Sequence, residues 1–336
     1  MRDVVNHFER YNNVDSFLLI DGCNQEMQPD LSVMIPTYLR PLLLKEAILS
    51  VINQADHNIN VEIVVVDNDA EANHSDLVDL INDLLPNNIR LFRNKENIGM
   101  FGNWNRCIEL ARAPLLTILN DDDQLHPDFI KLTFDMCQQR AISVSHVTFD
   151  EANTIKWSTV PLQLKIKPLN KTDFFIGNPI PGSLGLLMNK GQALELGGYN
   201  TELWPTADYD FSYRYFKRFG INQTSTKLSG YRWQENESMK VATLEGFMAN
   251  DIIFRTNMVN TSQCSFISKK ILKMLSELMA TSAAIHYRAV NNDFNTERTL
   301  KSNSIPPVYF KILRIKILHS VFIRLRKLIC HVLFLV

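Results

Sequence analysis

The chain has 336 residues, 46% hydrophobic and 21% charged, a composition typical of a globular protein with a sizeable core. Its five cysteines are scattered without a CxxC or Cys/His cluster, which argues against a disulfide framework and a structural zinc site. The net charge is −1, but residues 308–336 contain six Lys/Arg and no Asp/Glu, so the remainder is acidic and nucleic-acid binding is disfavoured.

Short apolar runs alternate with amphipathic segments from residue 31 to residue 149. The apolar runs predict buried strands at 31–36, 61–68, 88–94, 114–120 and 141–149. The segments between them predict helices at 41–54, 74–85, 101–112 and 126–140. This alternation predicts an α/β fold, a doubly wound and mostly parallel sheet with helices on both faces. Residues 207–220 and most of 241–300 also read as helical, so we expect a helical C-terminal part.

Acidic residues follow two of the predicted strands, where ligands of such sheets bind. Asp67 follows "VEIVVV", and Asp121, Asp122 and Asp123 follow "PLLTILN". Three adjacent carboxylates repel one another unless a cation or a positive dipole offsets their charge. A solvated turn that caps the next helix is the alternative for the triplet, and a simple turn cap is the alternative for Asp67.

Three kinds of cation or nucleotide site could use the triplet. An EF-hand loop starting at Asp121 would need Gly and Glu where His126 and Leu132 stand, so this interpretation fails. A nucleotidyltransferase would be expected to carry a glycine-rich phosphate loop after its first strand, but "PTYLRP" contains no glycine. A site for Mn²⁺ or Mg²⁺ on a diphosphate needs only one or two aspartates plus phosphate oxygens, and it fits.

Four ordered blocks carry a resemblance to a known family. They are "SVMIPTYLRPLLLKEAILSVINQ", "EIVVVDN", "NIGMFGNWNRCIELARAPLLTILNDDDQLHPDF" and "GGYNTELWPTADYDFSYRY". Together they resemble the family-2 glycosyltransferases of the GT-A fold, over about residues 31–240. The segment "YRWQENES" further resembles enzymes that assemble bacterial O-antigen and capsule oligosaccharides.

The resemblance implies a role for particular residues. Asp122, together with Asp121, would bind the metal ion, and Asp208 would be the general base. The donor-binding residues would be Pro36, Thr37, Arg40, Asp67, Asn97, Gly99, Asn105 and Asp121. Asp210 is the rival to Asp208, because residues two apart on a helix face different ways. The chain departs from the family at Ala207, where an acidic residue is common, and at Gln234, where a histidine is common.

The implied reaction is an inverting, metal-dependent transfer of a hexosyl or N-acetylhexosaminyl group from a nucleotide sugar, expected to be UDP-linked. The expected acceptor is a lipid-linked or cell-surface oligosaccharide in O-antigen or polysaccharide biosynthesis. The alternatives are an inactive sugar-binding or assembly relative and a nucleotidyltransferase-like enzyme. The corresponding division of the chain is an N-terminal extension (1–30), a glycosyltransferase domain (31–240), a helical region (241–307) and a basic tail (308–336). Within the glycosyltransferase domain, a nucleotide-sugar half (31–150) precedes an acceptor half (151–240).

The basic tail reads as an amphipathic helix. Stepping 100° per residue places the basic group Lys316, His319, Arg324, Arg326 and Lys327 on one side. The apolar group lies on the other side: Ile317, Leu318, Val321, Phe322, Leu325, Leu328 and Ile329. This pattern is typical of a helix lying on an anionic membrane, and a helix docked on the domain or at a dimer contact is the alternative. With no secretion signal and no membrane span in the sequence, we expect a cytoplasmic protein, peripheral at the inner face of the cell membrane.

Overall fold

The chain folds as two compact units, each described here by itself. The computed structural model describes residues 5–24, 28–55, 58–71, 75–138, 140–151, 154–161, 163–234 and 237–335. The first unit consists of Met1–Leu169, Ile180–Thr201 and Ala207–Gln234. The second consists of Asn170–Pro179, Glu202–Thr206 and Glu235–Val336, so it takes two short segments from within the predicted glycosyltransferase domain.

One sheet organises the first unit, with strand order β1-β4-β3-β2-β5-β9-β7-β10-β6 and with β8 paired to β10. The strands are β1 (Ser16–Asp21), β2 (Leu31–Thr37), β3 (Val61–Asp67), β4 (Ile89–Asn94), β5 (Leu115–Ile118), β6 (Gln124–Leu125), β7 (Ala141–Phe149), β8 (Ile166–Pro168), β9 (Leu186–Asn189) and β10 (Ile221–Arg232). Strands β4, β3, β2 and β5 run parallel, as do β7 and β10. The predicted α/β fold with a mostly parallel sheet is confirmed, while antiparallel β1, β6, β8 and β9 were not predicted.

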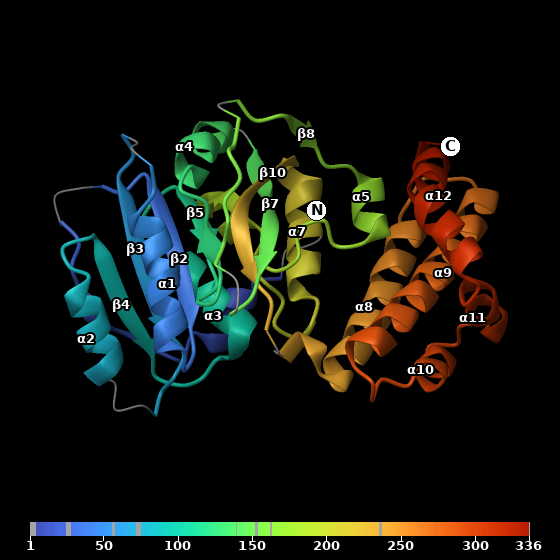
Figure 1. Cartoon of the computed structure of the whole chain (residues 1–336), viewed down its shortest axis with the longest axis horizontal. Helices are drawn as coiled ribbons and strands as arrows, with labels where there is room; N and C mark the ends of the chain where they lie inside the picture. Colours follow the sequence, from blue (N-terminus) through green and yellow to red (C-terminus); the bar gives the residue numbers. More distant parts are fainter. Residues whose placement is uncertain are drawn as a thin grey trace. The chain divides into compact units, whose positions relative to one another are not determined.

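Helices cover the sheet of the first unit, as Figure 1 shows for α1, which lies across β2 and β3. They are η1 (His7–Tyr11), α1 (Pro41–Ile52), α2 (Ser75–Asp83), α3 (Gly99–Leu110), α4 (Phe129–Thr133), η2 (Asp135–Gln138), α6 (Lys190–Glu195) and α7 (Ala207–Phe219). Alternate residues of β2, such as Val33 and Ile35, share one hydrophobic core with Leu44 and Ile48 of α1. The helix predicted at 126–140 is shorter than expected. It begins after the turn at Pro127 and ends as α4 at Thr133, whose hydroxyl donates to the Phe129 carbonyl.

Helix α3 lies deep in the first unit, and every residue from Phe101 to Ile108 is buried. Trp104 packs edge-on against Phe101 and Tyr199, with ring centroids 5.2 Å away in both pairs. The helix starts at Gly99, whose φ of 73° lies in the left-handed region that favours glycine. The position of α3 is therefore fixed by what surrounds it rather than by helix propensity alone.

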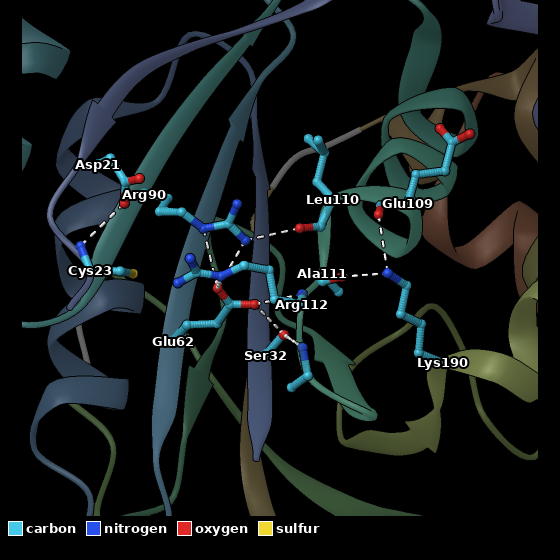
Figure 2. A network of polar contacts seen from close by, with 11 residues as sticks. Asp21, Cys23, Ser32, Glu62, Arg90, Glu109, Leu110, Ala111, Arg112 and Lys190 are labelled. Carbon is cyan, nitrogen blue, oxygen red and sulfur yellow. Dashed lines mark hydrogen bonds and ion pairs between the residues drawn. The ribbon is translucent and has the colours of Figure 1, made fainter. Parts of the chain in front are cut away.

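A buried charge network holds the C-terminal end of α3, at the edge of the sheet where β2, β3 and β4 begin (Figure 2). Glu62 accepts hydrogen bonds from Ser32 at 2.5 Å, from Arg90 at 2.8 Å and from the Arg112 side chain at 2.9 Å. Arg90 also donates to the Leu110 carbonyl at 2.9 Å. These bonds satisfy both the buried carboxylate and a carbonyl of the last helical turn, and so tie α3 to the sheet.

The segment before β2 forms part of the first unit. Strand β1 pairs antiparallel with β4 at one edge of the sheet. The buried Arg106 guanidinium of α3 donates to the carbonyls of Val14, at 2.8 Å, and Tyr11, at 3.2 Å. The predicted N-terminal extension thus contributes a strand and a covering for α3 within residues 5–21.

The second unit is helical, and the predicted helical C-terminal part is confirmed. Its helices are α5 (Lys171–Ile176), η3 (Glu237–Met239), α8 (Val241–Asn260), α9 (Phe266–Val290), α10 (Thr296–Ser302), α11 (Pro307–Leu313) and α12 (Lys316–Leu335). Leu244, Met248, Ala284 and Phe294 are among the residues of its own hydrophobic core. Among the described residues, no helix combines the length and the apolar character needed to cross a bilayer.

Candidate active site

The carboxyl ends of β2, β3 and β4 bring three polar side chains into one row. The register pairs Thr37 with Asp67, and Asp67 with Arg93. Pro36 precedes Thr37 in β2 and pairs with Val66. On the other side of β2, the Thr37 hydroxyl donates to Asp121 Oδ2 at 2.8 Å, so the acidic triplet joins the same edge.

Asp121 is a buried carboxylate held by the loop after β2. Besides Thr37, it accepts a hydrogen bond from the Tyr38 backbone at 3.3 Å, and the Arg40 guanidinium lies 3.4 Å away. Burial, and secondarily the neighbouring Asp122, raise the pKa of Asp121 to about 6, while the hydrogen bonds and Arg40 oppose that rise. A cation brought to this carboxylate would therefore relieve an existing electrostatic cost.

Asp122 lies beside Asp121 and is more exposed. Its Oδ2 accepts hydrogen bonds from Arg40 at 2.9 Å and from Gln234 Nε2 at 2.8 Å. Arg40 thus bridges Asp121 and Asp122, and it places a positive charge where two carboxylates meet. Gln234 occupies the position at which the resembling family often has a histidine, and it contacts the predicted metal ligand directly.

Asp123, in contrast, is turned into the protein and held by hydrogen bonds from Asn120 and Arg232. Its carboxylate accepts from Asn120 Nδ2 at 2.9 Å and from the Arg232 backbone at 3.0 Å, and it is almost fully buried. Burial raises its pKa to about 7, with the nearby Asp122 adding to the rise. Asp123 therefore joins β10 to the loop after β5, and Asp121 and Asp122 remain as the carboxylates available to a ligand.

Asp121 and Asp122 fit a hard divalent cation that is shared with a diphosphate. Within the described part of the chain, no group of three or more His, Cys, Asp or Glu side chains is arranged to hold a metal ion. Mg²⁺ and Mn²⁺ sites at a nucleotide need only one or two carboxylates, the phosphates and water completing the coordination. The Arg40 guanidinium bridging the two side chains shows that this place accommodates positive charge.

Asp67 is held rigidly at the end of β3. One oxygen accepts from Arg93 Nε at 3.1 Å and the other from the Asp69 backbone at 3.0 Å. Arg93 Nη2 is buried and has no hydrogen-bond partner among the described residues. A buried guanidinium nitrogen without a partner is costly, and a ligand oxygen beside Asp67 would remove that cost. Nothing in the sequence marks Arg93, because it is one of several arginines with no motif around it.

An asparagine network shapes the loop between β4 and α3. Asn68 Nδ2 donates to Asn97 Oδ1 at 2.8 Å, and its Oδ1 accepts from the Ile98 backbone at 3.1 Å. Asn97 also accepts from the Gly99 backbone at 2.9 Å. Asn97 and Gly99 are thereby held next to the residue that follows Asp67. The predicted donor-binding residue Asn105 is hydrogen-bonded to Tyr199 instead. Its Nδ2 donates to the Tyr199 carbonyl, and its Oδ1 accepts from the Tyr199 N–H.

Asp208 lies in the first turn of α7, and its carboxylate is largely buried. Its Oδ2 accepts from the Gly182 backbone at 2.8 Å, and the next residue, Ser183, donates to Asn120 at 3.4 Å. Asn120 immediately precedes Asp121, so the dipeptide 182–183 connects Asp208 to the acidic loop. Neither Gly182 nor Ser183 was singled out from the sequence.

Asp210 has a different environment. It forms an ion pair with Arg214 at 2.7 Å. Arg214 also donates to the carbonyls of Leu196 and Gly198, both at 2.7 Å. This arrangement fixes the turn that precedes Tyr199. Of the two acidic residues in the first turn of α7, Asp208 is therefore the one connected to the acidic loop.

The mostly parallel sheet with an acidic carboxyl edge has the architecture of the GT-A fold. Residues 32–188 match the family described as Glycosyl transferase family 2. This region of the chain is therefore similar to the family-2 glycosyl transferases.

Curated relatives agree with the family. A glycosyltransferase of Methanocaldococcus jannaschii is 29% identical over 191 residues, which cover 55% of this chain and 63% of that protein. A GalNAc(5)-diNAcBac-PP-undecaprenol beta-1,3-glucosyltransferase of Campylobacter jejuni is 36% identical over 98 residues, covering 29% and 31%. An abequosyltransferase of Salmonella typhimurium is 29% identical over 102 residues, covering 30% and 31%. The chain spans less than two thirds of the length of these relatives.

A solved structure shares the fold. Residues 1–349 of TarS from Staphylococcus aureus, in complex with UDP-GlcNAc, align with a TM-score of 0.55 over 90% of each chain. The sequence identity is 13%, so the likeness concerns the architecture.

Proposed function

We propose that the protein is a glycosyltransferase that moves a hexosyl or N-acetylhexosaminyl group from a UDP-linked donor, with inversion at the transferred carbon. The observation that carries the proposal is the meeting of Thr37, Arg40, Asp121 and Asp122 at the carboxyl edge of the sheet. A diphosphate fits there because two carboxylates and a guanidinium can share a cation and phosphate oxygens. TarS, which shares the fold, binds UDP-GlcNAc, and this supports uridine as the first nucleotide to test.

Asp67, Arg93 and the loop around Asn97 would bind the nucleoside part of the donor. Asp67 offers a fixed acceptor to a ribose hydroxyl or a base N–H, and Arg93 offers a buried donor for a base or ribose oxygen. Thr37 and Arg40 connect that end of the pocket to Asp121 and Asp122. Along this edge, Asp67 and Arg93 lie at the nucleoside end and Asp121 and Asp122 at the diphosphate end, which is the order of the groups in a nucleoside diphosphate.

Asp121 and Asp122 would hold Mn²⁺ or Mg²⁺, which would supply charge stabilisation to the departing nucleoside diphosphate. Arg40 lies against both carboxylates and is exposed, so its side chain can move onto a phosphate when donor and metal bind. Asp208 would accept the proton of the acceptor hydroxyl as that oxygen attacks the sugar. Its position at the start of α7 favours the ionised carboxylate, because the helix N-terminus is positive.

The acceptor we propose is a lipid-linked or cell-surface oligosaccharide, as in O-antigen or other polysaccharide biosynthesis. The name of the Campylobacter jejuni relative specifies an undecaprenol-linked acceptor, which supports a lipid-linked substrate for this chain. Such an acceptor is anchored in a membrane. We therefore place the protein at the cytoplasmic, inner face of the cell membrane, in contact with it through residues 308–336.

The test is a panel of nucleotide sugars screened by thermal shift with and without Mn²⁺, followed by a transfer assay on the donor that stabilises most. A bound donor raises the apparent melting temperature by mass action, so binding is visible before any acceptor is known. We expect a UDP-sugar to give the largest shift and Mn²⁺ to enlarge it. Inversion is tested by the anomeric configuration of the product, and retention would contradict a single displacement. No shift with any nucleotide sugar would contradict the proposed donor site.

A further inference from the structure

Helix α12 exposes a continuous apolar stripe. Within the second unit, the stripe consists of Ile317, Leu318, Val321, Leu325, Leu328 and Val332, all of which are exposed. On an α-helix these positions fall within about 100° of the circumference. Three further exposed apolar residues, Val308, Ile312 and Ile315, precede the stripe along the chain. An apolar surface of this extent on one helix marks an interaction site.

The opposite face of α12 is already occupied by the second unit itself. His319 shares a 2.7 Å hydrogen bond with Ser282 of α9, and Cys330 is fully buried. Phe334 packs edge-on against Phe175 of α5, with ring centroids 5.2 Å apart. The sequence pattern divided α12 into an apolar and a basic side, but the structure covers part of the basic side, because the helix also has to dock on α5 and α9. The apolar stripe therefore remains uncovered while α12 is docked.

Exposed basic side chains lie near the apolar stripe, with Arg324 directly beside it and Lys316 at the N-terminal end of the helix. Lys316 and Arg324 are exposed, and neither has an acidic partner in the described part of the chain. Besides His319, two residues predicted to lie with them differ. Arg326 is half-buried, and burial lowers its pKa. Lys327 forms an ion pair with Asp173 of α5 at 2.7 Å. The positive charge that borders the apolar stripe therefore comes from Lys316 and Arg324, with Lys311 and Arg314 exposed on the preceding segment.

We propose that the apolar stripe, bordered by Lys316 and Arg324, inserts shallowly into the interface of an anionic lipid bilayer. This inference deepens the membrane location proposed above by naming the surface, and it rests on no catalytic residue. Helices α11 and α12 contain no Asp or Glu, so no acidic side chain opposes contact with anionic headgroups. An apolar stripe beside a basic face is the pattern of a helix that lies in the membrane plane.

A second copy of the chain fits this surface less well. A twofold contact through the stripe would be self-complementary, with the same patch on both copies. Arg324, at the middle of the stripe, would then lie near Arg324 of the other copy, with no acidic residue on α11 or α12 to pair with either. Like charges held together in this way cost free energy, whereas anionic headgroups would neutralise them.

The experiment is flotation of the full chain with vesicles that contain about one third phosphatidylglycerol, compared with vesicles of phosphatidylcholine alone. Binding is expected only to the anionic vesicles, and it should weaken as salt is raised. Ile317→Asp places a charge on a residue that is 75% exposed, so the fold should be retained while vesicle affinity falls at least tenfold. Ile253→Asp is the matched control, because Ile253 of α8 is 59% exposed and lies outside α11 and α12.

The charges are tested separately. Lys316→Gln with Arg324→Gln should lower affinity about fivefold for each charge removed. The control pair is Lys165→Gln with Lys167→Gln, which makes the same change in net charge at exposed positions of the first unit and should leave binding unchanged. Nucleotide-sugar hydrolysis in the absence of vesicles should be the same for all four variants. A failure of the proposed catalytic function would therefore be distinguishable from a failure of the proposed membrane surface. The inference is overturned if the full chain does not bind anionic vesicles, if Ile317→Asp binds like the wild type, or if sedimentation shows that Ile317→Asp dissociates an oligomer.

Discussion

Gln234 Nε2 donates a 2.8 Å hydrogen bond to Asp122 Oδ2, although the two residues are 112 positions apart in the chain. The bond joins the end of β10 to the loop after β5, and it places an amide where a third metal ligand would be expected in the resembling family. A change of this amide to a carboxylate would put two like charges at hydrogen-bonding distance. Gln234 therefore provides a sensitive test of whether a cation binds at Asp122.

The first prediction concerns Gln234→Glu. Without metal, repulsion between the introduced carboxylate and Asp122 should lower the melting temperature. Mn²⁺ should restore it, because the cation removes the repulsion, so the Mn²⁺-induced shift should exceed that of the wild type. Differential scanning calorimetry with and without Mn²⁺ measures both effects. Gln28→Glu, at an exposed position, is the control. An equal Mn²⁺ response in the wild type and the variant would argue against a cation at this place.

Asp122→Asn is predicted to lower sugar transfer by roughly a hundredfold or more, since it removes charge from the proposed metal site. Mn²⁺-dependent nucleotide binding should weaken in isothermal titration calorimetry, while the unfolding transition stays cooperative. The control, Asp79→Asn, makes the same change at an exposed position of α2. Transfer at a near wild-type rate by Asp122→Asn would show that the site has been assigned to the wrong residue.

Asp208→Asn should lower turnover by roughly 10²- to 10⁴-fold, because the amide cannot accept the acceptor proton. Donor binding should remain nearly intact, because the side-chain oxygen of asparagine can still accept the hydrogen bond from the Gly182 backbone. Asp210→Asn breaks the ion pair with Arg214, so we expect a loss of stability and a much smaller loss of turnover. Rates and melting temperatures of the two variants give the comparison. A larger turnover loss in Asp210→Asn would reverse the two roles.

Arg93→Lys is predicted to weaken UDP binding by about ten- to a hundredfold, as expected for the loss of hydrogen bonds from a charged donor. Lysine keeps the positive charge beside Asp67 but lacks the forked geometry that holds Asp67 with one nitrogen and presents Nη2 with another. Isothermal titration calorimetry with UDP measures the effect. The matched control is Arg140→Lys, at an exposed position of the first unit. Unchanged UDP affinity in Arg93→Lys would remove Arg93 from the nucleoside site.

Glu62→Gln should destabilise the first unit by about 3 kcal/mol, because Arg90 would lose its ionic partner while remaining buried. The network also anchors the last turn of α3, so the loss of stability should be larger than for an exposed glutamate (Figure 2). Urea unfolding measures the difference. Glu96→Gln, at an exposed position before α3, is the comparison and should change stability by less than about 0.5 kcal/mol. Equal midpoints for the two variants would contradict this account of the network.

The sequence by itself determined the parallel core of the first unit and the edge at which Asp67 and the acidic triplet lie. Strands β2, β3, β4 and β5 have apolar runs that both faces of the sheet bury, and such runs are visible without any partner. Asp67 and Asp121 could be placed at one edge because each follows such a strand, and the carboxyl ends of parallel strands meet at one side of a sheet.

The tertiary structure decided which of these polar groups act together. Asp123 turns inward to Asn120 and the Arg232 backbone, although its neighbours in sequence face the site. Arg93 reaches Asp67 only because β3 and β4 pair in one register, and Gln234 reaches Asp122 only because β10 returns to the loop after β5. Contacts between residues so far apart leave no local periodicity, so no pattern in the chain predicts them.

Helix α12 shows the same division within one element. Its amphipathic character follows from a 3.6-residue period and could be read from the residue order. The residue order does not show which basic side chains remain without an acidic partner. Lys327 pairs with Asp173, and Arg326 becomes half-buried, only when α12 docks within the second unit. The helical period fixes the angles between side chains around the helix axis. Which of these side chains are buried depends on how segments distant in sequence pack against the helix.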